Sequence, residues 1–412
     1  MEKRRVVVTA MGVKSPIGTN LEEFLESLKN GVNGIKPISF LNVENLAVKV
    51  AGYVYDFDPL IYFEKKELRK IDRFCQFALA ATKDALKNQE ILKYHNPYRV
   101  GVIYSSGIGG MSTLEKEHEK MILKGADFVS VFLIPKMISN MAAGLISIET
   151  GFKGENFSIS TACASSSHAI GEAFRKIRDG YLDAAITGGA EAGISEFTLA
   201  GFNNLRALTN EKNPDKASIP FNKNRNGFVM GEGAGVLLLE ELSVAKKRKA
   251  KIFGEIVGYG TTSDAYHITK PDPSGEAQQK AIVFALEDAK ILKEDVDYVN
   301  AHGTSTKIND LVETKSLKLA FKEHAKKLLI SSTKSMTGHM LGAAGAVEAI
   351  ATILALKHGF VPPTIGLDEQ DLECDLFYTP NKFKEKNIKS AISSSFGFGG
   401  HNAVLCFKKY EE

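Results

Sequence analysis

Three side chains that can attack a carbonyl or move a proton lie in segments rich in small residues. Cys163 is in STACASSSHAIGEAF (160–174), His302 is in NAHGTST (300–306), and His339 is in STKSMTGHMLGAAGAVE (332–348). Each follows a strand-like run, and ligand chemistry usually gathers at strand ends in α/β proteins. If these ends converge, a thiol meets two imidazoles. Such a set suits acyl transfer, because it supplies a nucleophile and proton donors.

The spacing of apolar residues after Cys163 predicts that this residue begins a helix. Ala169, Ile170 and Phe174 recur at helical intervals, and NFSIS (156–160) before them is typical of a strand. Free N–H groups and the helix dipole favour a thiolate there, and can lower a thiol pKa from about 8.5 toward roughly 3.5–7.5. A small, buried core cysteine is the competing interpretation.

The other cysteines do not indicate a metal or disulfide framework. Cys75, Cys374 and Cys406 lie far apart and form no CxxC pair. Zinc held by Cys163 and the two histidines is disfavoured, because the spacings match no zinc motif. We therefore expect no metal cofactor in the catalytic site and a reducing, cytoplasmic location.

Two glycine-rich segments accompany these residues. SSSFGFGGHNAVLCF (393–407) places Phe396 and Phe398 among glycines, whose exposed N–H groups can hold an oxyanion. A plain hairpin with two aromatic anchors fits that segment equally well. GFVMGEGAG (227–235) contains a GxGxG pattern but leads into a strand-like run. It is therefore not interpreted as a dinucleotide or phosphate loop.

The elements that must position these residues alternate along the chain. This alternation recurs in both halves and predicts an α/β architecture with packed sheets, divided near residue 250. The expected strands span 5–11, 99–106, 183–189, 233–242, 297–303 and 327–333, the expected helices span 20–30, 66–88, 136–150, 275–290, 310–325 and 341–357, and a strand–turn–strand unit spans 390–407.

Composition excludes several classes of protein. The 412 residues are 44% hydrophobic and 25% charged, which is typical of a globular chain whose core needs no disulfides. A net charge of +3 does not indicate nucleic-acid binding. The longest apolar tract (344–356) is interrupted by a glutamate and is too short to span a bilayer. The short apolar run near the N-terminus is typical of a strand rather than a signal peptide, so we expect a soluble protein with no membrane insertion.

Taken together, the motifs resemble the β-ketoacyl-acyl-carrier-protein synthases, the elongating condensing enzymes, over essentially the whole chain. The similar segments, in order, are TACASSS, GFVMGEGAG, YGTTSDAYH, NAHGTST, SSTKSMTGHMLGAAGAVE and FGFGGHN. The family implies a thiolase-like fold in which two duplicated α/β halves (1–250 and 251–412) form a five-layer αβαβα core, usually in a dimer. The nearest branch is the type II enzyme of bacterial fatty acid synthesis.

The resemblance implies a role for each candidate catalytic residue. Cys163 would carry the acyl chain as a thioester, and the backbone N–H groups of Cys163 and Phe398 would form its oxyanion hole. His302 and His339 would promote decarboxylation of malonyl-acyl carrier protein and stabilise the enolate. The carbanion would attack the acyl thioester and release 3-oxoacyl-acyl carrier protein. Lys334 would order the histidines without acting as a nucleophile.

The resemblance also implies a set of substrate-binding residues. Two threonines would hydrogen-bond the phosphopantetheine arm, two phenylalanines would gate the cysteine, and a glutamate would pair with Lys334. Leu133 stands where many relatives carry Phe at the floor of the acyl pocket, which predicts a deeper pocket. The residues are Thr304, Thr306, Phe202, Phe398, Ile108, Leu133 and Glu348.

Two further comparisons with the family concern a cation site and two charged side chains. Asn300, Glu348 and the backbone near Ser393 and Ser394 resemble a site for a structural monovalent cation. The family commonly has Asn-Ser where this chain has Ser394-Ser395, which weakens that expectation. Lys270 and Lys307 replace residues that are usually neutral near the pantetheine arm. They either contact an anionic arm or are solvated.

Acyl carrier proteins are acidic, so a basic docking surface is expected. The second basic run, AKKRKAK (245–251), is interpreted as a solvated helix face. The segment EKKELRKIDR (64–73), which is similar to the docking segment of the family, and a separate arginine supply Lys65, Lys66, Arg69, Lys70, Arg73 and Arg206.

Several related functions compete with fatty acid elongation. The ketosynthase subunit of a type II polyketide or polyene synthase would use the same residues, in a heterodimer with a chain-length factor instead of a homodimer. A non-catalytic chain-length factor is disfavoured because Cys163 is present. A degradative thiolase would need a second cysteine near the C-terminal turn, and an initiating Cys-His-Asn enzyme would not have His339.

Overall fold

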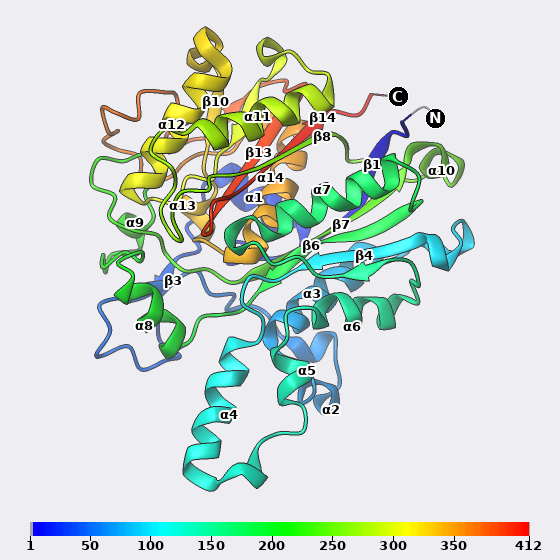
Figure 1. Cartoon of the computed structure of the whole chain (residues 1–412), viewed down its shortest axis with the longest axis vertical. Helices are drawn as coiled ribbons and strands as arrows, with labels where there is room; N and C mark the ends of the chain where they lie inside the picture. The colour runs from blue at the N-terminus through cyan, green and yellow to red at the C-terminus, as the bar shows by residue number, and fades with distance from the viewer. Residues whose placement is uncertain (1–2, 412) are drawn as a thin grey trace.

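Ten strands form one large sheet in the computed structural model, which describes residues 3–411 (Figure 1). Its strand order is β10-β9-β13-β14-β8-β1-β7-β6-β4-β5. The strands of the first half are β1 (Val6–Lys14), β4 (Val100–Ser105), β5 (Asn156–Phe157), β6 (Ala184–Glu191) and β7 (Gly233–Glu241). Those of the second half are β8 (Gly254–Ser263), β9 (Tyr298–Asn300), β10 (Leu329–Ser331), β13 (Ser390–Gly397) and β14 (His401–Lys408).

Both halves arrange their five strands in the same way. Counted from the start of each half, the spatial order is third, second, fourth, fifth, first in both cases. The halves meet where β1 pairs antiparallel with β8, from Val6 opposite Ile256 to Val8 opposite Gly254. This internal repetition is the duplicated α/β fold that was expected. The assignment of 1–250 and 251–412 as separate domains stays a prediction, because the sheet is continuous across that boundary.

The layers of the fold follow from alternation along the strands. On β7, Leu237 and Leu239 face the central core, whereas Val236 and Leu238 face a second core. On β14, Leu405 faces the central core. Its neighbours Val404 and Cys406 face a third core, so Cys406 points away from the central layer.

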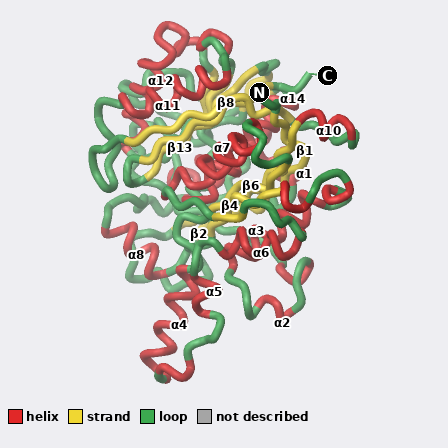
Figure 2. Tube along the Cα trace, turned by 45° about the vertical axis from the view of Figure 1, so that its right-hand side comes forward, coloured by secondary structure: helices red, strands yellow, loops and turns green. Residues whose placement is uncertain are grey.

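Helices fill the spaces that this alternation defines (Figures 1 and 2). The central layer consists of α7 (Ser165–Arg178) and α14 (Ala344–His358), the outer layer of the first half of α3 (Arg73–Leu86) and α6 (Met141–Thr150), and the outer layer of the second half of α11 (Glu276–Ala289) and α12 (Lys307–Phe321). The remaining helices are α1 (Leu21–Asn30), α2 (Lys65–Leu68), α4 (Met111–Lys124), α5 (Leu133–Met137), α8 (Glu196–Asn204), α9 (Pro214–Ala217), α10 (Leu242–Lys247) and α13 (Lys334–Thr337). Four short strands, β2 (Lys36–Pro37), β3 (Val50–Ala51), β11 (Phe360–Val361) and β12 (Lys384–Glu385), form two separate ribbons.

Two predicted helices are interrupted in the structure. The helix expected over 66–88 divides into α2 and α3, because the Asp72 side chain accepts a hydrogen bond from the Phe74 N–H and caps a new helix. The helix expected over 136–150 divides into α5 and α6. Of the strand expected over 156–160, only β5 (Asn156–Phe157) forms. The segment between β5 and the turn that contains Cys163 is irregular.

One stretch among the described residues, Leu341–His358, is long and apolar enough to cross a membrane by length and composition. It exceeds the apolar tract 344–356 because a 3₁₀ turn (Leu341–Ala343) continues into α14, in agreement with the helix expected over 341–357. Since 89% of the stretch is buried inside the molecule, it is a core helix of this fold.

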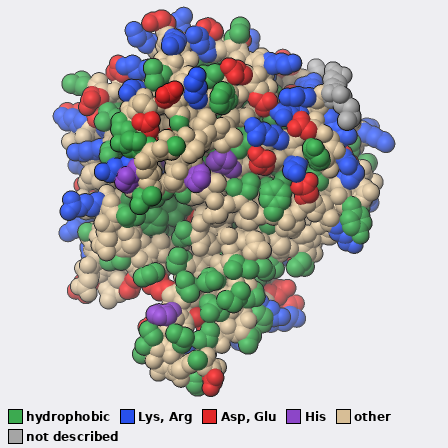
Figure 3. Space-filling view, in the orientation of Figure 1, with side chains coloured by type: hydrophobic (Ala, Val, Ile, Leu, Met, Phe, Trp, Pro, Cys, Tyr) green, Lys and Arg blue, Asp and Glu red, His purple; other side chains and the backbone are tan. Residues whose placement is uncertain are grey.

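Helices α4 and α5 project from the body as an arm, seen at the bottom of Figure 1. Figure 3 shows hydrophobic side chains gathered over the arm and its junction with the body. Val131, between the two helices, is 86% exposed. Other exposed apolar residues of the arm and the adjoining α6 are Met121, Ile122, Leu123, Phe128, Ile134, Ile138 and Ile148.

Candidate active site

Cys163 lies in a tight turn that opens the central helix α7. A 3₁₀ turn (Ala162–Ala164) runs directly into this helix, and Ala162 adopts a left-handed conformation with φ of 50°. Such a conformation is uncommon for a residue with a side chain and often marks a functional turn. Gly397 lies against the turn, where a Cβ atom would approach the Cys163 nitrogen to 3.1 Å. The prediction that Cys163 stands at a helix start is confirmed.

The three predicted catalytic side chains converge. The Cys163 sulfur and one ring nitrogen each from His302 and His339 lie within 4.8 Å of one another. The imidazole rings stand edge to face, with centroids 5.3 Å apart. All three residues are buried. The site therefore holds a nucleophile and two imidazoles in a space that one small acyl group can reach.

Buried acidic and basic groups fix the position of His302. Both Glu313 carboxylate oxygens accept hydrogen bonds at 2.7 Å, from the backbone N–H groups of His302 and Gly303. The Lys334 Nζ lies 3.4 Å from His302 Nδ1 and also donates to Glu348. Because an ammonium can only donate, Nδ1 accepts and the ring proton lies on Nε2. His302 is thus prepared to donate from Nε2.

Burial keeps both histidines neutral. It lowers the pKa of His302 and of His339 well below the ordinary value, and the neighbouring Lys334 ammonium lowers both further. Neither ring nitrogen of His339 has a hydrogen-bond partner within residues 3–411. Buried polar atoms are rarely left unpaired, so these nitrogens are available to a substrate.

The prediction of a lowered thiol pKa at Cys163 is wrong for the free protein. Burial raises the pKa of Cys163 to about 11. The Lys334 ammonium and the backbone N–H groups of Phe398 and Cys163 act in the opposite direction but are outweighed. Desolvation of the thiolate therefore exceeds its stabilisation by the helix start. The two N–H groups nevertheless point at the sulfur from the positions expected of an oxyanion hole.

A cavity of about 1020 Å³ connects these residues with the surface. Phe202 and Phe398 face each other in its wall, with ring centroids 6.4 Å apart. The Thr304 and Thr306 hydroxyl oxygens lie 2.9 Å apart along the same wall. Among the predicted residues, those that line the cavity are Cys163, His302, His339, Phe398, Phe202, Thr304, Thr306, Ile108 and Arg206.

Three of the predicted catalytic and substrate-binding residues lie outside the cavity lining. Lys334 and Glu348 are buried behind the histidines, where they pair with each other. Leu133 is half-buried in α5 on the projecting arm and does not line the cavity of its own chain. If Leu133 closes an acyl pocket, that pocket therefore belongs to a partner chain.

The predicted docking segment is exposed, with one exception. Lys65, Lys66, Arg69 and Lys70 are all exposed in and after α2. Arg73 is not free, because its guanidinium forms an ion pair with the buried Glu232 at 2.7 Å and lies over aromatic rings. Helix α2 and the end of α8, which is followed by Arg206, lie on different sides of the arm in Figures 1 and 2. One chain therefore presents two separate basic patches.

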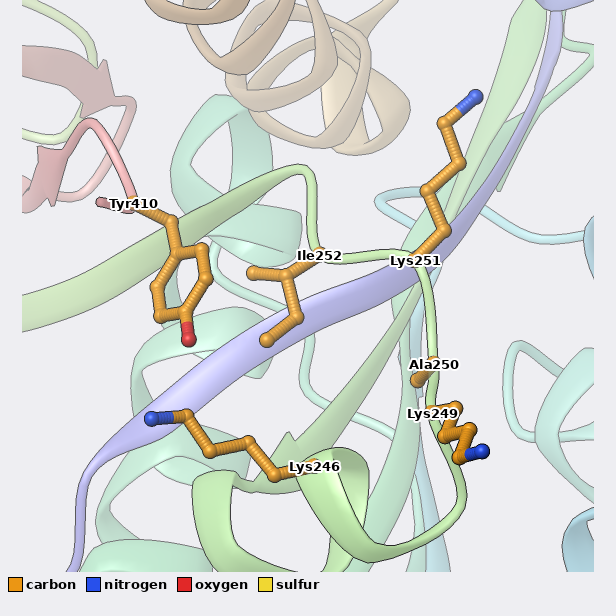
Figure 4. A pocket seen from close by; sticks show the side chains of 6 residues that line it. All are labelled: Lys246, Lys249, Ala250, Lys251, Ile252 and Tyr410. Carbon is orange, nitrogen blue, oxygen red and sulfur yellow. The ribbon is translucent and has the colours of Figure 1, made fainter. Parts of the chain in front are cut away.

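The second basic run borders a shallow surface pocket near the chain termini. Lys246, Lys249 and Lys251 line this pocket of about 570 Å³ together with Tyr410. Figure 4 shows that their amino groups point in different directions. Because the three amino groups do not converge, they do not form an anion-binding site. This agrees with its interpretation as a solvated face.

Sequence reasoning missed three buried residues that hold the site together. Glu313 lies on the inner face of α12 with Asp310 and Thr314, a polar row at helical spacing that signals an internal role. Glu191 accepts hydrogen bonds from the N–H groups of Gly107 and Gly342, and so ties the two halves beside the cavity. Its contacts depend on tertiary structure, and no sequence pattern indicates them.

The third missed residue, Arg225, supports the loop that carries the two threonines. Its guanidinium is buried and donates to the Thr306 and Lys307 carbonyl groups at 3.2 and 3.0 Å. It also pairs with Asp310 at 3.3 Å and Asp371 at 2.7 Å. A guanidinium that donates to two carbonyl groups and pairs with two carboxylates fixes the loop geometry as well as neutralising charge.

Both halves of the chain match family models. The beta-ketoacyl synthase N-terminal domain matches residues 3–245, and the beta-ketoacyl synthase C-terminal domain matches residues 253–368. The chain belongs to the β-ketoacyl synthase family. It is therefore an acyl-transferring condensing enzyme with a thiolase-like fold, as its motifs and duplicated sheet indicated.

Individual relatives agree with this family. A 3-oxoacyl-[acyl-carrier-protein] synthase 2 from Synechocystis sp. is 48% identical over 413 residues, covering 100% of this chain and 99% of the relative. The solved ishigamide ketosynthase/chain length factor is 34% identical with a TM-score of 0.93, covering 99% and 100% of the two chains. The AntDE ketosynthase, solved in complex with its type II PKS acyl-carrier protein AntF, is 32% identical with a TM-score of 0.92 and full coverage of both chains.

The thiol and imidazole donors are also of the kind that bind soft metals. Cys163, His302 and His339 form the one group of three or more such donors within the described residues 3–411. A structural zinc site usually has four ligands, and a catalytic one keeps a water in the fourth position. The expectation that catalysis here needs no metal stays a prediction.

We predict that alkylation of Cys163 by iodoacetamide accelerates about tenfold per pH unit between about pH 7 and about pH 9. A thiol with a pKa of about 11 is almost fully protonated over that range, so the reactive thiolate fraction keeps rising. Intact-mass kinetics measure the rate, and Cys163→Ala shows how much label reaches the other, buried cysteines. A rate that levels off near neutral pH contradicts the raised pKa.

Proposed function

We propose that this chain elongates fatty acids by condensing an acyl group carried on Cys163 with malonyl-acyl carrier protein, giving 3-oxoacyl-acyl carrier protein. The convergence of Cys163, His302 and His339 within 4.8 Å is the observation that carries the proposal. The thiol can hold an acyl chain while the two neutral imidazoles contact a second substrate. Decarboxylation of that substrate makes the carbon–carbon bond formation effectively irreversible.

In the first step the acyl group moves from its carrier to Cys163. The thiol loses its proton as the substrate arrives, and the carrier thiol leaves with a proton, so the exchange is balanced. The backbone N–H groups of Cys163 and Phe398 stabilise the oxyanion that develops on the thioester carbonyl. Closure of the cavity around the substrate strengthens these interactions, because water is excluded.

In the second step malonyl-acyl carrier protein occupies the same cavity. The malonyl carboxylate leaves as carbon dioxide, and the electron pair moves onto the thioester carbonyl to give an enolate. His302 donates from Nε2 toward the enolate oxygen, and the unpaired nitrogens of His339 complete the site. The enolate carbon then attacks the acyl thioester and frees the Cys163 sulfur.

Fatty acid elongation is favoured over polyketide synthesis by the comparisons. The curated relative at 48% identity is a 3-oxoacyl-[acyl-carrier-protein] synthase 2. The polyketide and ishigamide ketosynthases have lower identities of 32% and 34% despite their similar shape. A ketosynthase role with a chain-length factor is therefore the second candidate.

The carrier partner we propose is an acidic acyl carrier protein. The related AntDE ketosynthase was solved in complex with its type II PKS acyl-carrier protein. On this chain the exposed side chains of Lys65, Lys66, Arg69 and Lys70 form one basic patch, and Arg206 marks the cavity mouth. An acidic carrier is attracted to both surfaces. A cytoplasmic location fits the free, buried cysteines.

We also propose that the working unit is a homodimer formed through the arm. Exposed apolar side chains that gather on one projecting element mark an interaction site (Figure 3). Leu133 lies on the same arm, so a second copy would bring it toward the acyl pocket.

A structural monovalent cation fits the residues that the family resemblance indicated. Asn300, Glu348 and Ser393 each have a buried side-chain oxygen without a hydrogen-bond partner among residues 3–411. Ser393 pairs with Asn300 across β13 and β9, so their side chains share one face. A cation there would satisfy these oxygens and rigidify the back of the site. Ser394 points to the opposite face, so the loss of Asn at that position leaves the other ligands in place.

For the function itself, we predict that Cys163→Ala abolishes both the acyl-enzyme mass shift and condensation. Cys163→Gln should retain decarboxylation of malonyl-acyl carrier protein, because the histidines perform that step. Intact mass spectrometry with acyl-carrier protein, and carbon dioxide release with malonyl-carrier protein, measure the two steps. Condensation by pure Cys163→Ala, or loss of decarboxylation in a folded Cys163→Gln protein, contradicts the proposal.

For the dimer, light scattering after size exclusion should give the mass of two chains. Paired substitutions Val131→Asp and Ile134→Asp should shift the protein to single chains, because they bury charge in the contact. Leu372→Asp, at an exposed position outside the arm, is the matched control. A single-chain mass for the unmodified protein would favour the heterodimer with a chain-length factor.

For the cation, the thermal midpoint should be higher in potassium or sodium chloride than in choline chloride of equal ionic strength. A ligand that binds only the folded state stabilises it. Ser393→Ala should reduce the difference, and Ser243→Ala, at an exposed position in α10, should not. Equal midpoints in all three salts would exclude a stabilising cation at this site.

A further inference from the structure

A single buried carboxylate lies behind one wall of the acyl pocket. Glu191, the last residue of β6, is 0% exposed and takes no part in either step of the proposed reaction. β6 pairs in parallel with β4 up to Ser105 opposite Gly189, so the two strands end side by side (Figure 1). The Glu191 side chain therefore reaches the glycine-rich loop 106–110 that follows β4.

Four donors from the two halves of the chain converge on this carboxylate. One oxygen accepts hydrogen bonds from the Ser106 hydroxyl at 2.8 Å and from the Ile108 N–H at 3.3 Å. The other oxygen accepts from the Gly107 N–H at 2.8 Å and from the Gly342 N–H at 2.9 Å. An ionised carboxylate only accepts hydrogen bonds and offers about four acceptor positions. These donors therefore use its full capacity.

The two backbone segments that share the carboxylate are in direct contact. A Cβ atom on Gly107 would lie 2.7 Å from the Glu191 Oε2 and 3.2 Å from the Gly342 nitrogen. A Cβ atom on Gly342 would lie 2.2 Å from the Gly107 nitrogen. These distances are shorter than van der Waals contact, so only glycine fits at either position. Because the contact has no slack, the carboxylate fixes one segment relative to the other.

Both segments form part of the cavity lining. Gly107 and Ile108 line the cavity from the first half, and Leu341 lines it from the second. The Ile108 side chain packs over Gly193, where a Cβ atom would lie 2.4 Å from the Ile108 Cδ1. Since Gly193 follows Glu191 by two residues, the end of β6 locates both the backbone and the side chain of Ile108. The carboxylate thus sets the distance between two walls that come from different halves.

The charge of Glu191 does not assist the nucleophile. Burial raises the pKa of Glu191 to about 7, and its four hydrogen bonds counteract this effect. The carboxylate in turn raises the pKa of Cys163, because a nearby negative charge disfavours the thiolate. Among the described residues, Glu191 is also not one of those that line the cavity. Its influence on the reaction must therefore come through the walls that it holds.

We propose that Glu191 is a positioning residue for acyl-chain selection, which holds the Gly107–Ile108 wall and the Leu341 wall of the pocket at a fixed separation. This inference rests on the proposed function, because it concerns the chain that Cys163 carries. A rigid pocket discriminates between acyl groups by how well they fit, whereas a pocket whose walls can separate accepts a wider range at similar cost. Glu191 acts through the residues it holds and touches neither the substrate nor the reacting atoms.

The test measures how steeply acylation depends on chain length. Short, medium and long saturated chains are presented on acyl carrier protein at about pH 8, where the Glu191 carboxylate is ionised. Intact mass gives the second-order rate of Cys163 acylation for each chain. In Glu191→Gln the amide nitrogen cannot accept a hydrogen bond, so at least one donor of the wall loses its partner. We expect the ratio between the fastest and the slowest chain to fall at least about fivefold.

Two further variants separate this role from a general loss of stability. Ser106→Ala removes one donor and keeps the carboxylate, so the same ratio should fall by a smaller factor. Glu240→Gln is the matched control, because Glu240 is equally buried and ion-paired with Arg248 but lies opposite Ala184, at the other end of β6. It should lower the thermal midpoint and leave the ratio unchanged. Circular dichroism establishes that each variant is folded.

Each outcome either supports or overturns the inference. A ratio that falls in the two wall variants and not in Glu240→Gln supports it, and Ser106→Ala alone decides if Glu191→Gln does not fold. An unchanged ratio in the folded wall variants, an equal fall in Glu240→Gln, or equal rates for all chains in the unmodified protein overturns the role of Glu191 alone. If no carrier-bound chain acylates Cys163 in the unmodified protein, the proposed function fails as well.

Discussion

Desolvation around one buried ion pair governs the chemistry of this site. Lys334 and Glu348 are both buried and pair with each other behind the histidines. The same dry environment raises the pKa of Glu348 to about 7 and that of Cys163 to about 11, and lowers the pKa of both histidines. Breaking a buried pair of this kind leaves an uncompensated charge, which is strongly destabilising. The ammonium is therefore held in place, and it gives His302 its Nε2–H tautomer.

The duplicated fold explains how this environment is assembled. The two helices of the central layer begin in the same way, with a 3₁₀ turn whose first residue is left-handed: Ala162 with φ of 50° and Leu341 with φ of 47°. The first turn presents Cys163. The equivalent position of the second turn is Gly342, whose N–H is accepted by Glu191 of the other half. One copy of the turn thus supplies the nucleophile, and the other holds the halves together beside it.

Much of the fold and the identity of the catalytic residues could be predicted from sequence, because hydrophobic periodicity and motif order are local properties. Their environment could not. The pKa of the Cys163 thiol is one example, because a helix start is visible in sequence, whereas complete burial of Cys163 depends on the packing of both halves. The resemblance implies docking for Arg73 because it belongs to the basic run 64–73, although its ion pair with Glu232 joins positions 159 residues apart. The resemblance implies a place for Leu133 in the acyl pocket, but in its own chain this residue lies on the arm.

The contrast between the interior and the mouth follows from the same physical principle. A buried site lined by neutral imidazoles gives little long-range attraction for an anionic substrate, so attraction must come from the entrance. Arg206, Lys270 and Lys307 lie where charges remain hydrated and cost little to maintain. Placing cations at the mouth and excluding them from the acyl pocket allows a charged carrier arm and an apolar chain to bind in one cavity. Steering of the substrate and stabilisation of the enolate are then separate tasks for separate residues. A change at the mouth therefore alters which donors enter without changing the chemistry at Cys163.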